Sequence, residues 1–140
     1  MKTRSTNIFY PDLSYKLYGL LYKVHNQLGR FRNENQYADA LEQLFKENNI
    51  NYIRELPLPQ SFEGEKAGRN IPDFIIEDKI ILDIKAKRLI TKEDYYQMRR
   101  YLVSYKKKLG ILVNFRQISI SPKRILNTEL LKNNSYHSYT

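Results

Sequence analysis

The stretch that most constrains the fold is IPDFIIEDKIILDIKAK, residues 71–87, in which two apolar runs flank a charged tip. Short runs of large and β-branched apolar residues, bounded by polar residues, are typical of buried strands. Residues 70–76 and 80–86 therefore predict a β-hairpin that turns at the segment EDK, residues 77–79. A buried hairpin of this kind needs further layers to cover it.

Three charged residues, Asp73, Asp83 and Lys85, interrupt this apolar pattern. With a three-residue tip, Asp73 lies directly opposite Asp83 on one face of the hairpin. Lys85, two residues farther along the strand, points to the same face. A two-residue tip would instead pair Asp73 with Ile84 and would separate the two carboxylates. The hairpin register thus decides whether these three charges meet.

Three amphipathic helices are expected around the hairpin. Apolar residues recur at helical spacing between Pro11 and Gly29, where the glycine is a natural stop. Asn33 is placed to cap a second helix that ends near residues 46–49. A third helix is expected to start at Thr91, with Asp94 in a variant of the capping box, and to run to residue 108.

The remaining apolar segments predict further strands. Residues 51–62 contain two prolines and loose alternation, which favours an extended or edge segment, and residues 110–115 form a short buried strand. The order helix, helix, three strands, helix, strand is typical of an α/β domain with a central sheet covered by helices. With 140 residues, we expect a single domain over residues 1–126 and a polar tail over residues 127–140.

Composition narrows the chemistry. The chain has no cysteine and only two histidines, His25 and His137, which excludes thiolate metal sites and leaves oxygen ligands, the type that suits Mg²⁺ or Mn²⁺. We expect His25 to be a helix-surface or partly buried residue. The formal charge of +9 favours a polyanionic partner, although a solvated basic surface has the same composition. No apolar run reaches membrane-spanning length and no signal peptide is evident, so a cytoplasmic location and no membrane partner are expected.

The grouping of Asp73, Asp83 and Lys85 suits one type of reaction. Two adjacent carboxylates are unfavourable unless a positive charge lies between them, and a divalent cation supplies it. Such a metal acidifies a water, and the metal and a lysine together stabilise the charge that develops in phosphodiester hydrolysis. The alternative is an ion-paired strand end, in which Lys85 bridges both carboxylates without a metal.

These motifs resemble a known nuclease family. PDF at residues 72–74, followed by ILDIKAK at residues 81–87, looks like the signature of the PD-(D/E)XK nuclease superfamily. Residues 24–45 are similar to the segment that names the GxxExxY family within it, and the resemblance extends over residues 12–126. It implies an α/β fold with a restriction-endonuclease-like core, a mixed central β-sheet flanked by helices. Phe31 stands where the name motif opens with glycine, and Asp83 where glutamate is commoner.

The resemblance also implies roles for individual residues. Asp73 and Asp83 would be metal ligands, Lys85 the catalytic lysine, and Glu34 an additional catalytic acid at the metal or its water. Gln97 and Tyr101 resemble the Q-x-x-x-Y element of RecB-like exonucleases, which lies beside the active site. Two simpler interpretations stay open: Tyr101 as a core aromatic residue, and Glu34 as an acid that stabilises the first turn of a helix.

A basic segment follows the predicted catalytic strand. Residues 84–108 contain nine lysines or arginines against two acids, which favours phosphate contacts. Lys106, Lys107 and Lys108 are better explained by the C-terminal end of a helix. We expect the nucleic acid to be bound by the following residues: Lys87, Arg88, Gln97, Arg99, Arg100 and Tyr101.

Taken together, these features favour a magnesium- or manganese-dependent nuclease that acts on nucleic acid, with DNA preferred. Two alternatives remain: a nuclease-fold protein that binds nucleic acid without cutting it, and an interaction subunit of a larger system. A homodimer is compatible with this function, because two cuts on a duplex often need two sites.

Overall fold

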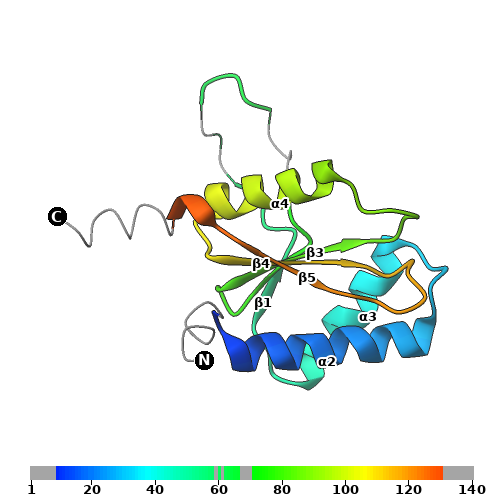
Figure 1. Ribbon diagram of the computed structural model, residues 1–140. Helices are drawn as coiled ribbons and strands as arrows, with labels where there is room; N and C mark the ends of the chain where they lie inside the picture. The colour runs from blue at the N-terminus through cyan, green and yellow to red at the C-terminus, as the bar shows by residue number, and fades with distance from the viewer. Residues whose placement is uncertain (1–8, 59, 61, 67–70, 131–140) are drawn as a thin grey trace, which may run out of the picture.

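The computed structural model describes residues 9–58, 60, 62–66 and 71–130 of the chain. Within them lie three long helices and five strands (Figure 1). In chain order these are α2 (Pro11–Leu28), α3 (Glu34–Glu47), β1 (Tyr52–Arg54), β2 (Phe74–Ile76), β3 (Ile80–Lys85), α4 (Lys92–Tyr105), β4 (Leu109–Asn114) and β5 (Lys123–Leu126).

The strands form one mixed sheet in the order β1-β2-β3-β4-β5. Strands β3 and β4 are parallel and are joined through α4, whereas all other neighbours are antiparallel. Helices α2 and α3 cover one face of the sheet and α4 covers the other (Figure 1). This is the expected α/β architecture, with a mixed central sheet between helical layers.

The β2–β3 hairpin has the three-residue tip on which the sequence argument depended. Ile76 pairs with Ile80 and Phe74 pairs with Leu82. Glu77 and Asp78 turn the chain with φ angles of 51° and 56°, in the left-handed region that aspartate, as at residue 78, adopts more often than most residues. Continuing this register by one pair places Asp73 opposite Asp83, so that their side chains point to the same face.

Alternation along β3 divides the core into two halves. Ile80, Leu82 and Ile84 pack in the larger cluster beneath α2 and α3, whereas Ile81 packs in the smaller cluster beneath α4. Because side chains alternate across a strand, the odd-numbered Asp83 and Lys85 point to the α4 face. The same strand thus fills one core and carries charged groups toward the helix that covers the other.

Both predicted helix starts are confirmed. The Asn33 side chain accepts a hydrogen bond from the Gln36 amide at 2.9 Å, and Gln36 bonds back to the Asn33 amide at 3.0 Å. At the start of α4, Asp94 accepts a hydrogen bond from the Thr91 amide at 2.7 Å. These contacts satisfy backbone groups that a helix leaves unpaired at its first turn.

One helix boundary differs from expectation. Helix α4 ends at Tyr105 rather than at residue 108, because Lys106 adopts a left-handed conformation with φ 56°. Lys107 lies beyond the helix, and its Nζ forms an ion pair with Asp78 on the hairpin tip at 2.7 Å.

A fifth strand, β5, was not predicted, because residues 123–126 show no strand pattern strong enough to recognise. The strand pairs with β4 along the sheet edge. Directly after it, the buried side chain of Asn127 donates hydrogen bonds to the carbonyls of Leu102 and Lys107. Residues 131–140, most of the predicted polar tail, lie outside the described part of the chain. No helix in the described part is long and apolar enough to cross a membrane.

The turn between α2 and α3 is held by Tyr37, which has no exposed surface. Its ring stacks on Phe115 with the centroids 4.2 Å apart, and its hydroxyl donates to the Gly29 carbonyl at 2.6 Å. The same hydroxyl accepts a hydrogen bond from the Arg32 amide at 3.2 Å. Tyr37 therefore positions the first turn of α3, where Glu34 lies.

Replacing Tyr37 with phenylalanine should lower the free energy of unfolding by roughly 1–3 kcal/mol, because two backbone groups of the turn lose their partner. Urea denaturation measures this change. Tyr15→Phe is the matched control, since Tyr15 is 82% exposed and should tolerate the loss of its hydroxyl. Equal stabilities of the two variants would show that the turn does not depend on this hydroxyl.

Candidate active site

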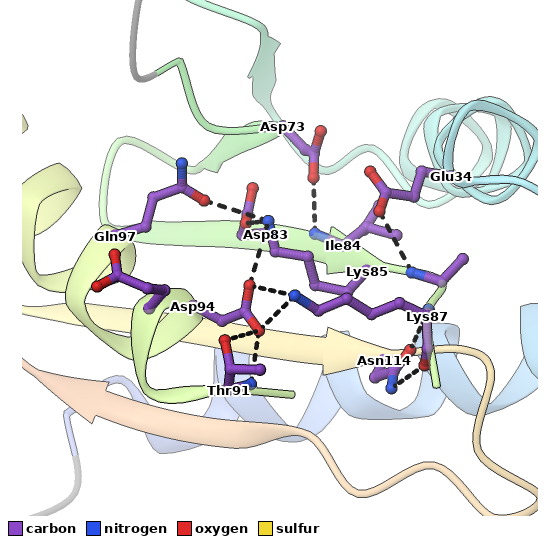
Figure 2. Close-up of polar contacts among 12 residues, drawn as sticks. Glu34, Asp73, Asp83, Ile84, Lys85, Lys87, Thr91, Asp94, Gln97 and Asn114 are labelled. Atoms are coloured by element: carbon purple, nitrogen blue, oxygen red, sulfur yellow. Dashed lines mark hydrogen bonds and ion pairs between the residues drawn. The ribbon is translucent and has the colours of Figure 1, made fainter. Parts of the chain in front are cut away.

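The predicted catalytic residues meet at one end of the sheet. The C-terminal end of β3, the turn that leads into α3 and the first turn of α4 all lie there (Figure 1). Asp73 comes from the residue before β2, Asp83 and Lys85 from β3, and Glu34 from the start of α3 (Figure 2). Segments far apart in the sequence thus contribute to a single polar cluster.

Asp73 and Asp83 form a pair of like charges. Asp83 is 5% exposed, and the Asp73 carboxylate accepts a hydrogen bond from the Ile84 amide at 2.6 Å. Burial and the charge of Asp83 raise the pKa of Asp73 to about 8, even though the hydrogen bond from Ile84 acts in the opposite direction. Glu34 adds to this effect through its negative charge.

Lys85 is anchored on the opposite side of Asp83. Its Nζ lies 3.1 Å from the Asp83 carboxylate and donates to the Gln97 side-chain oxygen at 3.1 Å. Burial would lower the pKa of Lys85, but the charge and hydrogen bond of Asp83 outweigh it, so the pKa is raised. The ammonium form therefore persists throughout the neutral range. Among the described residues, Lys85 forms ion pairs with Asp83 and Asp94 but not with Asp73, so it does not bridge the two carboxylates of the hairpin.

Glu34 lies at the exposed edge of the cluster. Its carboxylate accepts a hydrogen bond from the Ala86 amide at 3.3 Å, just beyond the end of β3 (Figure 2). The position in the first turn of α3 also agrees with the simpler interpretation of an acid at a helix N-terminus. Among the described residues, no three acidic or histidine side chains are grouped closely enough to hold a metal ion by themselves.

Gln97 and Tyr101 of α4 both face the sheet. Gln97 binds Lys85, whereas Tyr101 is 4% exposed and its hydroxyl donates to the Ile71 carbonyl at 3.3 Å. Burial and then the charges of Asp83 and Asp73 raise the pKa of Tyr101, which keeps its hydroxyl protonated. Tyr101 is thus both a core residue and a close neighbour of the two carboxylates.

Asp94 belongs to this site, although sequence reasoning gave it only a capping role. It is 7% exposed, and its carboxylate lies 2.7 Å from the Nζ of Lys87 and 4.0 Å from that of Lys85 (Figure 2). Burial would raise the pKa of Asp94, but hydrogen bonds from Lys87 and Thr91 outweigh it and lower the pKa. The spacing of Lys85 and Lys87 was a usable signal, because side chains two residues apart along an extended chain point to the same face.

Asn114 was also missed. It pairs with Lys85 across the parallel strands β3 and β4, and its side chain bonds to both the amide and the carbonyl of Lys87, at 3.1 and 2.7 Å. It thereby fixes the segment that follows β3. Only the register of two strands distant in sequence shows this contact, so no local pattern could have identified it.

Of the predicted nucleic-acid contacts, only Lys87 and the two α4 residues described above lie at the cluster. Lys87 is already paired with Asp94. Arg99 and Arg100 are exposed and line a hollow between α4 and the residues that follow β5, away from the carboxylates. Arg88 is exposed beyond the end of β3. The structure does not bring these three arginines together with Asp73 and Asp83.

The donor set fits a hard divalent cation. Lys87 and Asp94 neutralise one another. The other carboxylates of the cluster, those of Glu34, Asp73 and Asp83, then outnumber the remaining ammonium, that of Lys85, by two negative charges when all are ionised. Carboxylate oxygens are the ligands that Mg²⁺ and Mn²⁺ prefer. Asp73 and Asp83 are the residues that would hold such an ion.

The raised pKa of Asp73 predicts a pH-dependent stability in the presence of a chelator. The folded protein holds the Asp73 proton more tightly than the unfolded chain does, so this stabilisation is complete below pH 4 and is lost as the pH rises toward 8. Asp73→Asn retains the acceptor for Ile84 without the charge. We expect the variant to have a higher melting temperature than the wild type at pH 8 and a smaller difference at pH 5.

The matched control is Asp78→Asn on the exposed hairpin tip. The hydrogen bond from Lys107 lowers the pKa of Asp78, so removing its charge should not stabilise the protein at any pH in this range. Calorimetry at several pH values measures both variants. A wild type and an Asp73→Asn variant with parallel pH profiles would show that the two aspartates do not repel one another.

Comparison with known proteins agrees with this geometry. The sequence pattern of the PD-(D/E)XK nuclease superfamily matches residues 11–125. Among curated proteins, none matches the chain. A similar solved structure, that of SSO0001, has 23% sequence identity and a TM-score of 0.51 over 72% of this chain. The matched region is 55% of the length of SSO0001, and the likeness supports the fold alone. The length of the family match, with the hairpin and its three charges inside it, shows that the chain belongs to the PD-(D/E)XK nuclease superfamily.

Proposed function

We propose that the protein is a nuclease that hydrolyses phosphodiester bonds with the help of a divalent cation. One observation carries the proposal: the partly buried Asp73 carboxylate faces Asp83, and the Lys85 ammonium pairs with Asp83 and Asp94 rather than with Asp73. An electrostatic arrangement of this kind is unfavourable in the free protein and becomes favourable when a cation binds. The superfamily membership supports the same reaction.

Each side chain would then have a distinct role. A bound divalent cation supplies Lewis acidity, which lowers the pKa of a water and offsets phosphate charge. Asp73 and Asp83 hold it through oxygen ligands. Lys85, which stays protonated, donates hydrogen bonds to a phosphate oxygen and stabilises the charge that develops there, and it is therefore not the general base.

Two further residues complete this assignment. Gln97 is a positioning residue, because its side-chain oxygen holds the Lys85 ammonium in place. Glu34 adds a third acid on the exposed side of the cluster, near the metal or its water. The placement of Glu34 and Tyr37 in the first turn of α3 supports assignment to the GxxExxY family, which we include in the proposal. The proposal also includes Mg²⁺ or Mn²⁺ as the cofactor and DNA as the substrate. It further includes the cytoplasm as the location and a dimer on duplex substrates.

The second candidate is a protein of this fold that binds nucleic acid without cutting it. Its support is that, among the described residues, no three acidic or histidine side chains are grouped closely enough to hold a metal ion by themselves. Binding without a metal is nevertheless disfavoured at the cluster, because an excess of negative charge repels phosphate.

Magnesium or manganese should raise the melting temperature of the wild type. At a metal concentration 100 times the dissociation constant, the gain is about 2.7 kcal/mol. Asp73→Asn and Asp83→Asn should abolish this shift, because each removes a charged ligand, whereas Asp78→Asn should retain it. Differential scanning calorimetry measures the shift. An unchanged shift in both site variants would place metal binding elsewhere.

Cleavage should depend on Lys85. We expect Lys85→Ala to reduce the rate about 10²- to 10³-fold, the usual cost of losing one group that stabilises transition-state charge. Linear, circular, single-stranded and double-stranded DNA, and RNA, are incubated with metal, and products are resolved on gels. Lys79→Ala on the exposed hairpin tip is the control. Cleavage by Lys85→Ala at the wild-type rate would count against the proposal. So would an absence of cleavage by the wild type on every substrate.

A further inference from the structure

Phe31 is an apolar side chain in an unusual place. It lies in the turn between α2 and α3, where it is 74% exposed beside the charged end of the sheet. An exposed aromatic residue alone needs no explanation. Here, however, the guanidinium carbon of Arg30 lies 4.7 Å from the ring centroid and that of Arg116 lies 5.8 Å from it.

The two arginines are held in position by backbone groups. The Nε atoms of Arg30 and Arg116 each donate to the other residue's carbonyl, at 2.8 and 3.1 Å. Arg116 also donates to the Ala86 carbonyl at 3.2 Å, next to the amide that binds Glu34. These contacts fix two cations beside Phe31 and connect the turn to the end of β3.

No acid neutralises this group within the described part of the chain. Arg54 and Arg100, by comparison, both pair with carboxylates, whereas no ion pair joins Arg30, Arg32 or Arg116 to a described acid. The positive charge is therefore available to an anion. Phosphate groups suit guanidinium particularly well, because two N–H groups can bind two oxygens together.

A hollow joins this group to the catalytic cluster. It is lined by Phe31, Arg32 and Arg116 together with Glu34 and Ala86. A strand that lies in the hollow would contact an aromatic ring and guanidinium groups next to Glu34 of the catalytic cluster.

We propose that Phe31, with Arg30, Arg32 and Arg116, forms a subsite for one unpaired nucleotide of a single-stranded nucleic acid, in which a base stacks on Phe31 and its phosphate binds the arginines. Base stacking on an aromatic side chain needs an open base face, which a single strand offers and the interior of a duplex does not. This inference rests on the proposed nuclease function, for which it names the substrate class.

The test measures binding separately from cleavage. Fluorescently labelled 15-nucleotide oligothymidylate and a 15-base-pair duplex are titrated with the protein in a chelator at 50 mM salt, and anisotropy is followed. Phe31→Ala should weaken binding of the single strand about 5- to 150-fold, which corresponds to 1–3 kcal/mol for one stacked base. Binding of the duplex should change less than about twofold, since its stacked bases do not reach the ring.

Three variants establish that stacking is responsible. Phe31→Tyr should retain binding, whereas Phe31→Leu, which keeps apolar bulk without an aromatic face, should lose it as alanine does. Phe62→Ala is the matched control, because Phe62 is 64% exposed and lies outside the hollow. Arg32→Ala should weaken binding and reduce the slope of log K against log salt by about 0.7, the value for one phosphate contact on a single strand.

Other results would overturn the subsite. The first is an absence of oligothymidylate binding in the wild type, and the second is an equal loss of affinity for single strand and duplex in Phe31→Ala. The third is full binding of the single strand by Phe31→Leu. The fourth is a change of oligomeric state in Phe31→Ala, which would make this face a surface for a second copy of the chain. Stacking without cleavage by the metal-loaded wild type would refute the nuclease proposal alone, and cleavage without dependence on Phe31 would refute the subsite alone.

Discussion

The rest of the site depends on the antiparallel register of β2 and β3. A three-residue tip sets Asp73 opposite Asp83 and lets the Asp73 carboxylate receive the Ile84 amide. A shift of one residue would turn an aspartate toward the apolar core under α2 and α3. Burial of Ile80, Leu82 and Ile84 on that face therefore enforces the register, and the hydrophobic core itself brings two carboxylates together at an unfavourable distance.

Charge is distributed unequally around the two aspartates, and this separates the candidate functions. The lysines of β3 and of the segment after it are paired with Asp83 and Asp94, whereas Arg30 and Arg116, which form no ion pair with a described acid, place positive charge on the rim. Phosphate would thus be attracted to the rim and repelled by the centre until a cation is bound. A protein that only binds nucleic acid gains nothing from such a centre, whereas a metal-dependent hydrolase requires one.

Much of this arrangement could be predicted because it is encoded locally. Helical spacing, caps at Asn33 and Thr91, and the hairpin pattern depend on neighbours in sequence, and all three are confirmed. The contributions of Asp94 and Asn114 depend instead on how α4 and β4 cross back over β3, which no local pattern specifies. The predicted end of α4 was wrong for a related reason, since the ion pair between Lys107 and Asp78 of the hairpin tip competes with continuation of the helix. Strand β5 gains its definition from pairing with β4 rather than from its own residues.

The capping box of α4 has a broader consequence. The Asp94 carboxylate accepts a hydrogen bond from the Thr91 amide at the start of the helix and also forms an ion pair with Lys87. The same carboxylate therefore caps the helix and contributes to the electrostatics of the cluster. Glu34 and Tyr37 likewise connect the start of α3 to the sheet, because Glu34 accepts a hydrogen bond from the Ala86 amide after β3 and Tyr37 stacks on Phe115 after β4. A chain emerging during synthesis consequently lacks the assembled polar cluster until its distant segments have docked, and the proposed activity would begin only then.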